Sequence, residues 1–238
     1  MNKEKIKDDV RRLIDAYNLL VGGIDHKADE SDRAYGGVIR AGKGALVESL
    51  AKSMVSIVWR EIGGKPNRFS LDKQTIKIPI NTAYIEKIES PEVRKYIKDN
   101  IHDYYYVAKT DVHVYVDKKF VMGIECKAYT ENAMFKRILV DFTLLKQANK
   151  NLDCVLFQLE SQLGGDYGKI SKDIIYGSGS THTLLSYFDV NLSIVTLLEG
   201  ERKVDKPIHK KEYAKELGEE GLFKAMTFFE NHLKKYLS

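Results

Sequence analysis

A predicted β-hairpin in the middle of the chain places two carboxylates and a lysine on one face. Apolar residues alternate on both sides of a polar turn at residues 117–119, a pattern typical of two paired strands. Because successive strand side chains point to opposite faces, Glu125 and Lys127 share one face of the second strand. Asp111, at the start of the first strand, shares a face with His113 and is predicted to lie opposite Glu125.

The register of this hairpin depends on the length of its turn. A three-residue turn pairs Val116 with Phe120. The same register puts Asp111 opposite Glu125, with Cβ atoms about 5 Å apart. An even number of turn residues would remove Asp111 from that position.

Two neighbouring carboxylates repel each other unless a cation lies between them. Mg²⁺ is one such cation, and it prefers carboxylate and carbonyl oxygens together with a phosphate group. Asp111, Glu125 and the backbone carbonyl of Cys126 are the predicted ligands, and the ion would lower the pKa of an attacking water. Lys127 would stabilise the developing charge or help to deprotonate that water. The alternative is a simple ion pair on an exposed sheet face, worth about 0–1 kcal/mol, but Gly123 on this face leaves room for a close backbone approach and favours a functional site.

Composition and charge limit the class of protein. The chain has 238 residues and 43% apolar content, enough for one large α/β domain with a real core. Its net charge of +4 permits nucleic acid as a partner without requiring it. Cys126 and Cys154 lie in apolar strand-like runs and indicate a reducing compartment. The sequence has no signal peptide and no apolar run of the roughly 20 residues that a membrane span needs, so we predict a cytoplasmic protein with no membrane contact.

The first 43 residues are predicted to form a helix and a basic loop. Helical spacing of apolar residues covers 3–20. The stretch from Gly37 to Gly44 nearly matches a phosphate-binding loop, but it lacks the hydroxyl residue and the preceding apolar strand of that motif. The plainer interpretation is a flexible basic entry to the next helix, in which Arg40, Lys43 and backbone amides contact phosphates, or an ordinary surface loop.

The next helix, from Gly44 to Ile62, carries Glu48 near the edge of its apolar stripe. A carboxylate at that boundary can lean into a cleft. It can equally be a solvated residue that pairs with Lys52 one turn further on.

Two further elements are predicted before the hairpin. Residues 74–80 alternate like a strand, which Pro79 confines to a sheet edge or a strand end. Ser90 and Pro91 suit the cap and the first position of a helix. The tyrosines at 104–106 then lead into the hairpin.

The elements after the hairpin complete an α/β pattern. A helix opens at Asn132, an apolar strand covers 152–159, a Gly-rich segment covers 160–183, and a strand at 192–198 precedes a closing helix. Strand, strand, helix, strand is the order of a central mixed β-sheet flanked by helices. We predict a single domain whose core spans 44–160, followed by the Gly-rich loop, strand and C-terminal helix of 161–238.

The hairpin and the elements that follow it resemble the PD-(D/E)xK nuclease superfamily. Asp111, the turn, and then Glu125-Cys126-Lys127 match its motif in the usual strand-turn-strand context, with Thr110 where the motif has proline. The run that continues to residue 160 looks most like type II restriction endonucleases of the EcoRI-like group.

This resemblance implies a restriction-endonuclease-like fold with Asp111 and Glu125 as metal ligands and Lys127 as the catalytic lysine. It implies Glu48 as a helix glutamate near the metal. The implied activity is Mg²⁺-dependent, sequence-specific hydrolysis of double-stranded DNA by a homodimer.

The loop and helix after the lysine are the predicted DNA-facing elements in this resemblance. Asparagine suits adenine edges, and arginine suits guanine edges or phosphates. The residues concerned are Tyr129, Thr130, Asn132, Lys136 and Arg137. A helix cap and solvated basic residues are the alternative. Three other functions remain open at this point: a repair or junction-resolving nuclease of the same fold, a non-catalytic DNA-binding module, and a nucleotide-binding protein.

Overall fold

The computed structural model describes residues 3–24, 32–168, 177–206 and 213–237. Its centre is a five-stranded sheet with the spatial order β1 (Phe69–Ser70), β4 (Val112–Val116), β5 (Lys119–Glu131), β6 (Asp153–Gln162) and β7 (Leu192–Thr196). β4 runs antiparallel to its two neighbours, β1 and β5, and β5, β6 and β7 are parallel. The predicted α/β class with a central mixed sheet is confirmed.

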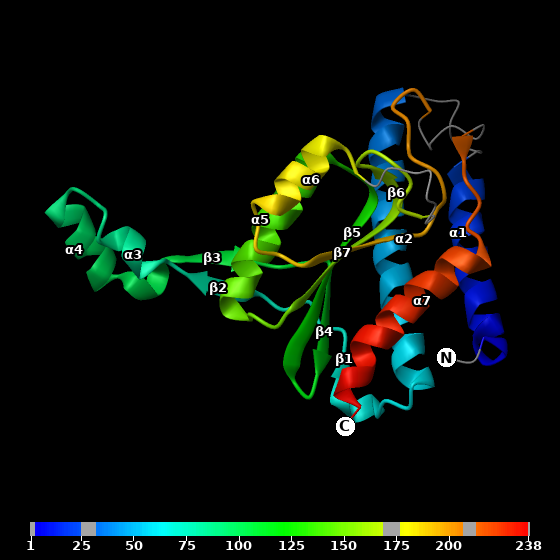
Figure 1. Ribbon diagram of the computed structural model, residues 1–238, viewed down its shortest axis with the longest axis horizontal. Coiled ribbons are helices and arrows are strands. Elements are labelled where there is room, and N and C mark those ends of the chain that lie inside the picture. Colours follow the sequence, from blue (N-terminus) through cyan, green and yellow to red (C-terminus); the bar gives the residue numbers. More distant parts are fainter. Residues whose placement is uncertain (1–2, 25–31, 169–176, 207–212, 238) are drawn as a thin grey trace.

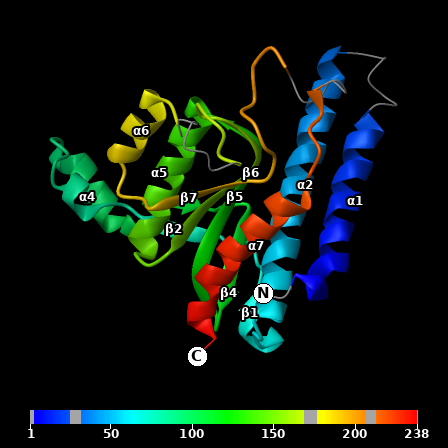
Figure 2. The same ribbon diagram turned by 45° about the vertical axis from the view of Figure 1, so that its right-hand side comes forward.

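Helices cover both faces of this sheet, as Figures 1 and 2 show. One face packs against α2 (Asp32–Glu61) and α7 (Glu219–Leu233), and α1 (Lys7–Ile24) packs on these two helices. The other face packs against α5 (Asn132–Ala148) and α6 (Gly179–Ser186). The apolar faces of α5 and α7 are buried. No helix in the described ranges is both long enough and apolar enough to cross a membrane.

The turn of the β4–β5 hairpin differs from the prediction. Val116 pairs with Lys119 instead of Phe120, so only Asp117 and Lys118 remain in the turn. Both have positive φ, 51° and 63°. Two such residues are typical of a type I′ turn, whose twist matches that of the strands it joins. Lysine rarely adopts this conformation, which is why the sequence pattern favoured a longer turn.

A β-bulge then corrects the register. Val112 pairs with Ile124 and the pairing shifts between Val114 and Tyr115, so β5 contains one extra residue. The bulge turns Phe120 to the other face of the hairpin, where its ring stacks on His113 with centroids 4.5 Å apart. Two departures from the predicted register therefore cancel, and the open end of the hairpin keeps its predicted alignment.

The predicted basic loop ahead of the second helix is wrong. The backbone is helical from Asp32 through Gly44 to Glu61, without an intervening loop. Four glycines in this part weaken helix propensity by roughly 1 kcal/mol each relative to alanine, which explains the misassignment. The near match to a phosphate-binding loop between Gly37 and Gly44 lies inside the helix, so its backbone cannot cradle a phosphate as that loop does.

The Gly-rich segment contains more regular structure than predicted. β6 continues to Gln162, and α6 begins at Gly179 with Ser178 as its cap, which accepts a hydrogen bond from the Thr181 backbone. Leu163 packs in the core beneath α5. Residues 169–176 lie outside the described part of the chain.

A second, two-stranded sheet projects away from the body as an arm, here residues 76–108 (Figure 1). It consists of β2 (Ile76–Pro79), α3 (Thr82–Ile85), α4 (Pro91–Asp99) and β3 (Tyr105–Ala108). Pro79 ends its strand, and Ser90 and Pro91 begin α4, as predicted. Because β3 ends three residues before Asp111, the arm leads directly into the open end of the hairpin.

Candidate active site

The open end of the hairpin brings Asp111, Glu125 and Lys127 together. Asp111 immediately precedes β4, and Glu125 and Lys127 lie two residues apart on β5. The backbone N–H of Cys126 donates a hydrogen bond to Asp111 Oδ2 at 2.8 Å. This contact fixes the carboxylate of Asp111 across the strand from Glu125, where side-chain alternation predicted it.

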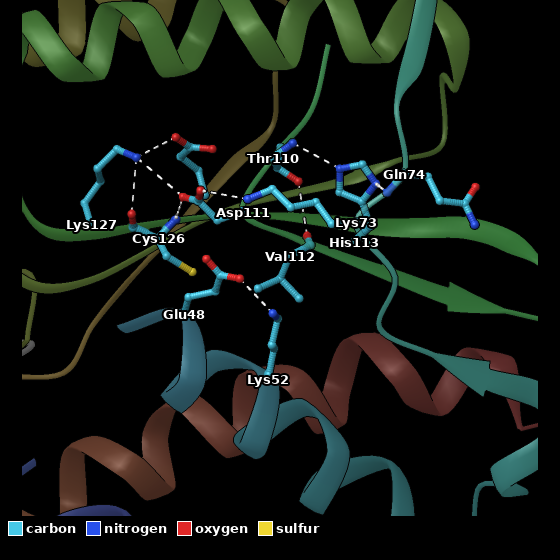
Figure 3. Close-up of polar contacts among 11 residues, drawn as sticks. Glu48, Lys52, Lys73, Gln74, Thr110, Asp111, Val112, His113, Cys126 and Lys127 are labelled. Carbon is cyan, nitrogen blue, oxygen red and sulfur yellow. Dashed lines mark hydrogen bonds and ion pairs between the residues drawn. The ribbon is translucent and has the colours of Figure 1, made fainter. Parts of the chain in front are cut away.

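Three oxygen atoms converge on the ammonium group of Lys127 (Figure 3). Lys127 Nζ lies 2.5 Å from Glu125 Oε1 and 3.2 Å from the carbonyl oxygen of Cys126. It lies 3.5 Å from Asp111 Oδ2. The ammonium thus marks a position for a cation that is surrounded by hard oxygen donors.

The charges in this cluster shift one another's pKa values. Burial raises the pKa of Glu125, and the neighbouring Asp111 raises it further, while Lys127 opposes both. Burial alone would lower the pKa of Lys127, but Glu125 and Asp111 outweigh it and the pKa is raised. The lysine is therefore an ammonium ion at neutral pH, and two carboxylates share its single positive charge.

The donor set suits a small divalent cation such as Mg²⁺. Two carboxylates and a backbone carbonyl supply oxygen ligands, and such an ion usually keeps water and phosphate as its remaining ligands. Among the described residues, no three or more His, Cys, Asp and Glu side chains form a group that could hold a metal ion. The predicted ligands Asp111, Glu125 and the Cys126 carbonyl nevertheless lie around one point, the Lys127 ammonium, to which each presents an oxygen atom.

Glu48 approaches from the opposite side of the sheet. It projects from α2 toward Cys126, and its carboxylate pairs with Lys52 Nζ at 2.7 Å (Figure 3). Its charge contributes, after burial and the two nearer carboxylates, to the raised pKa of the Cys126 thiol. The structure thus shows the ion pair between Glu48 and Lys52, which was the alternative interpretation of the sequence. Glu48 makes no contact with Lys127 in the described structure.

Thr110, which stands where the resembled motif has proline, makes two hydrogen bonds beside Asp111. Its backbone N–H donates to His113 Nε2 at 3.0 Å, and its hydroxyl donates to the carbonyl of Val112 at 3.1 Å. Proline has no N–H and cannot make the first bond. Burial, aided by Lys73, lowers the pKa of His113 to about 4, so its ring stays neutral and accepts this bond.

Two charged residues of the site were missed by the sequence analysis. Lys73, from the segment between β1 and β2, places Nζ 3.7 Å from Asp111 Oδ1. Asp141, on α5, adds to the raised pKa of Glu125, and burial raises its own. Asp141 lies at the edge of the α5 apolar stripe, so the argument applied to Glu48 would have found it. Lys73 lies in a segment without a periodic pattern of apolar residues, so its position beside Asp111 could not be predicted from the sequence.

The residues predicted to contact DNA from α5 differ in exposure and in hydrogen bonding. Lys136 and Arg137 are exposed, and Arg137 lies 3.8 Å from Asp141 with 86% of its side chain accessible. Asn132 Oδ1 accepts a hydrogen bond from the Thr181 hydroxyl at 2.8 Å. Neither Thr130 nor Asn132 caps α5, because the cap position belongs to Glu131.

The remaining predicted contacts are less accessible or undescribed. Thr130 is fully buried, so its hydroxyl does not face solvent. The ring of Tyr129 is covered by the guanidinium group of Arg202, 3.6 Å from its centroid. The backbone at Arg40 and Lys43 is helical, and their side chains lie outside the described part of the structure.

Comparisons with known proteins give one close relative. Over 239 aligned residues the chain is 48% identical to the type II restriction enzyme DdeI of Desulfomicrobium norvegicum, covering 98% of this chain and 99% of that protein. No family model matches the chain. A low-resolution structure of the native BbvCI A2B2 tetramer aligns with 98% of this chain and 90% of that one, at a TM-score of 0.34 and 11% identity.

Proposed function

Because the chain belongs to the type II restriction enzymes, which cut double-stranded DNA at specific sequences, we propose that Asp111, Glu125 and Lys127 form its active site. The enzyme is a sequence-specific endodeoxyribonuclease. The observation that carries the assignment of the site is the convergence of three oxygens on the Lys127 ammonium. This arrangement supports a site of the PD-(D/E)xK type.

Mg²⁺ is the proposed cofactor, with Asp111, Glu125 and the Cys126 carbonyl as its ligands. When bound, such an ion polarises a phosphodiester and lowers the pKa of a water molecule. The Cys126 N–H keeps the Asp111 carboxylate oriented. Lys127 keeps its proton at neutral pH, so its ammonium can stabilise the negative charge that develops on the phosphate.

Glu48 is proposed as an outlying member of this site. This proposal is supported by the position of the Glu48 carboxylate beside Cys126, on the opposite side of β5 from Lys127. Because Lys52 already neutralises it, we expect its removal to cost less activity than the removal of Asp111.

Digestion of plasmid DNA tests the proposed chemistry. The purified protein should convert a plasmid into a fixed set of fragments in Mg²⁺ and leave it intact in EDTA. Asp111→Asn and Lys127→Ala should leave it intact in both. A ladder of random products would contradict site-specific cleavage, and wild-type cutting by either variant would contradict the active site. Sequencing the ends of the fragments gives the recognition site and the stagger of the cut.

The first turns of α5 are the proposed DNA-facing surface. Lys136 and Arg137 are exposed there, and Asn132 stands at the start of the helix. The positive end of the helix dipole adds to the attraction for phosphate. Asparagine and arginine also have the hydrogen-bonding groups to distinguish bases.

We also propose that the enzyme acts as a homodimer, with the arm as its interface. Two active sites related by a two-fold axis suit the cleavage of both strands of a symmetric sequence. Most of the large apolar side chains exposed in the described residues belong to the arm: Tyr84, Val93, Tyr96, Ile101, Tyr105, Tyr106 and Val107. A groove of about 960 Å³ at its root is lined by Pro79, Tyr105 and, on α5, Leu144.

The charge of the arm favours protein over DNA as its partner. Acidic and basic residues are equal in number between 76 and 108, so the arm has no net attraction for phosphate. Exposed tyrosines and aliphatic side chains are instead typical of the core of a protein interface. A second copy of the chain docked here would hold two active sites in a fixed relation, because β3 leads into Asp111.

Analytical ultracentrifugation tests this interface. Tyr96→Ser, in the exposed part of α4, should raise the dimer dissociation constant about tenfold or more. Tyr187→Ser is the matched control, because Tyr187 is also exposed but lies at the end of α6, outside the arm. A wild-type enzyme that cuts both strands as a monomer would contradict the dimer. Unchanged association of Tyr96→Ser would contradict only the placement of the interface.

A further inference from the structure

Arg202 is held at the carboxyl ends of two parallel strands. Its backbone N–H donates to the carbonyl of Ser161 on β6 at 2.8 Å. Its Nη1 donates to Gln162 Oε1, the last residue of β6, at 2.9 Å. The centre of its guanidinium group lies 3.6 Å from the ring centroid of Tyr129 on β5. In open α/β sheets, ligands bind outside the carboxyl ends of the strands.

The charge of Arg202 is not neutralised within the described residues. No acidic side chain in that part of the chain forms an ion pair with it, and its Nε is buried without a hydrogen-bond partner. Arg68, at the turn of the hairpin, is the contrasting case, because it donates two hydrogen bonds to the carboxylate of Asp117. A half-buried guanidinium without a counter-charge is costly unless an anion binds to it.

The contacts of Arg202 prepare it for an anion with two oxygen atoms to offer, such as a phosphate group. Stacking on Tyr129 and the bond to Gln162 fix the plane of the guanidinium group. A fixed fork of N–H donors matches the oxygens of a phosphate group, and little conformational entropy remains to be lost on binding.

The position of Arg202 relates it to the active site. Tyr129 lies two residues beyond Lys127 on β5, and alternation puts both side chains on the same face, about 6–7 Å apart along the strand. A DNA strand with one phosphate at Lys127 has further phosphates on either side. We propose that Arg202 binds a backbone phosphate that flanks the one being cleaved, an inference that rests on the proposed function because it takes DNA as the ligand.

Salt-dependent DNA binding tests this site. Affinity for two duplexes, one with the cleavage sequence found from digested ends and one scrambled, would be measured by fluorescence anisotropy in EDTA. Arg202→Gln should weaken both by a similar factor of about ten and make the slope of log K against log salt concentration less steep by about 0.9, the value for one phosphate contact. Arg11→Gln, an exposed arginine on α1, removes the same charge and should change neither quantity.

The second part of the test uses the stacking partner. Arg202→Lys keeps the charge without the planar fork, so it should retain most of the salt slope and lose part of the affinity. Tyr129→Phe keeps the ring and should bind like the wild type, whereas Tyr129→Leu should fall between the wild type and Arg202→Gln. If thermal unfolding shows that Arg202→Gln does not fold, these variants still test whether Arg202 binds a DNA phosphate.

Three outcomes would overturn the proposal. Unchanged affinity and salt slope in Arg202→Gln would show that Arg202 makes no contact with DNA. A loss confined to the cleavage sequence, with the scrambled duplex unaffected, would assign Arg202 to a base edge. Equal losses in Arg11→Gln would show a general effect of charge. A wild-type protein that neither binds nor cuts DNA would instead contradict the proposed function.

Discussion

At the turn of the β4–β5 hairpin, Arg68 donates two hydrogen bonds to one carboxylate, that of Asp117, at 2.8 and 2.7 Å. At the open end of the same hairpin, Lys127 is shared between the carboxylates of Asp111 and Glu125. Both clusters join acidic and basic residues on two neighbouring strands. They differ in the balance of charge and in the burial of their carboxylates, and these differences distinguish a structural ion pair from the proposed active site.

The turn end is balanced. One guanidinium faces one carboxylate, the side chain of Asp117 is 49% exposed, and hydrogen bonding to Arg68 lowers the pKa of Asp117. Arg68 also donates to the carbonyls of Tyr236 and Leu237, which ties the hairpin to the C-terminal end of the chain. Each donor and acceptor already has a partner within the protein, so a ligand has nothing to add.

The open end is unbalanced. Asp111, Glu125 and Asp141 bring three carboxylates close together, whereas Lys127 and the more exposed Lys73 supply two ammonium groups, and burial raises the pKa of Glu125. The protein thereby retains negative charge in a half-buried place, where a divalent cation would be favoured over solvent. Negative charge that the fold compensates only in part thus distinguishes the proposed active site from the turn.

Asp111→Asn should have the largest effect on this comparison. We expect the cleavage rate to fall by about 10²–10³-fold or more, because a ligand and its charge are both lost. The stability of the fold should be unchanged or higher, because one of two repelling carboxylates is removed. Single-turnover cleavage and thermal unfolding of the same preparation measure the two effects. A variant that loses activity only because it unfolds would contradict this interpretation.

Thr110→Pro should have an intermediate effect. The substitution restores the proline of the motif but removes the N–H that donates to His113. Losing a buried hydrogen bond costs about 1–3 kcal/mol of unfolding free energy. We also expect slower cleavage, because Thr110 directly precedes Asp111. Thr110→Val keeps the N–H and is the control, and equal stability of the two variants would show that this bond does not hold Asp111 in place.

The same hairpin shows how far sequence patterns reach. The alternation that puts Glu125 and Lys127 on one face is a local property of a strand, so it could be predicted residue by residue. The length of the turn could not, because Lys118 adopts a positive φ that its residue type disfavours. The predicted pairing of Val112 with Ile124 is observed only because a bulge in β5 offsets the shorter turn. No pattern in the sequence indicated this bulge.

Contacts between distant segments were the least predictable part of the site. Lys73 and Asp141 come to the hairpin from a loop and from α5, and Arg202 comes from beyond β7. Their positions follow from tertiary packing and not from periodicity. α2 begins at Asp32 although glycines weaken the helix propensity of its first turns, so propensity did not indicate this start.

Asp117→Asn should have the smallest effect and tests the comparison most directly, because it makes at the turn the same chemical change that Asp111→Asn makes at the open end. Asparagine tolerates the positive φ of 51° at this position, so the turn should keep its shape. Arg68 retains its bonds to the two C-terminal carbonyls. We therefore expect a slightly lower melting temperature and cleavage within about twofold of the wild type. If Asp117→Asn instead slowed cleavage as much as Asp111→Asn, the balance of charge would not distinguish the two ends, and the active site would have to extend along the whole hairpin.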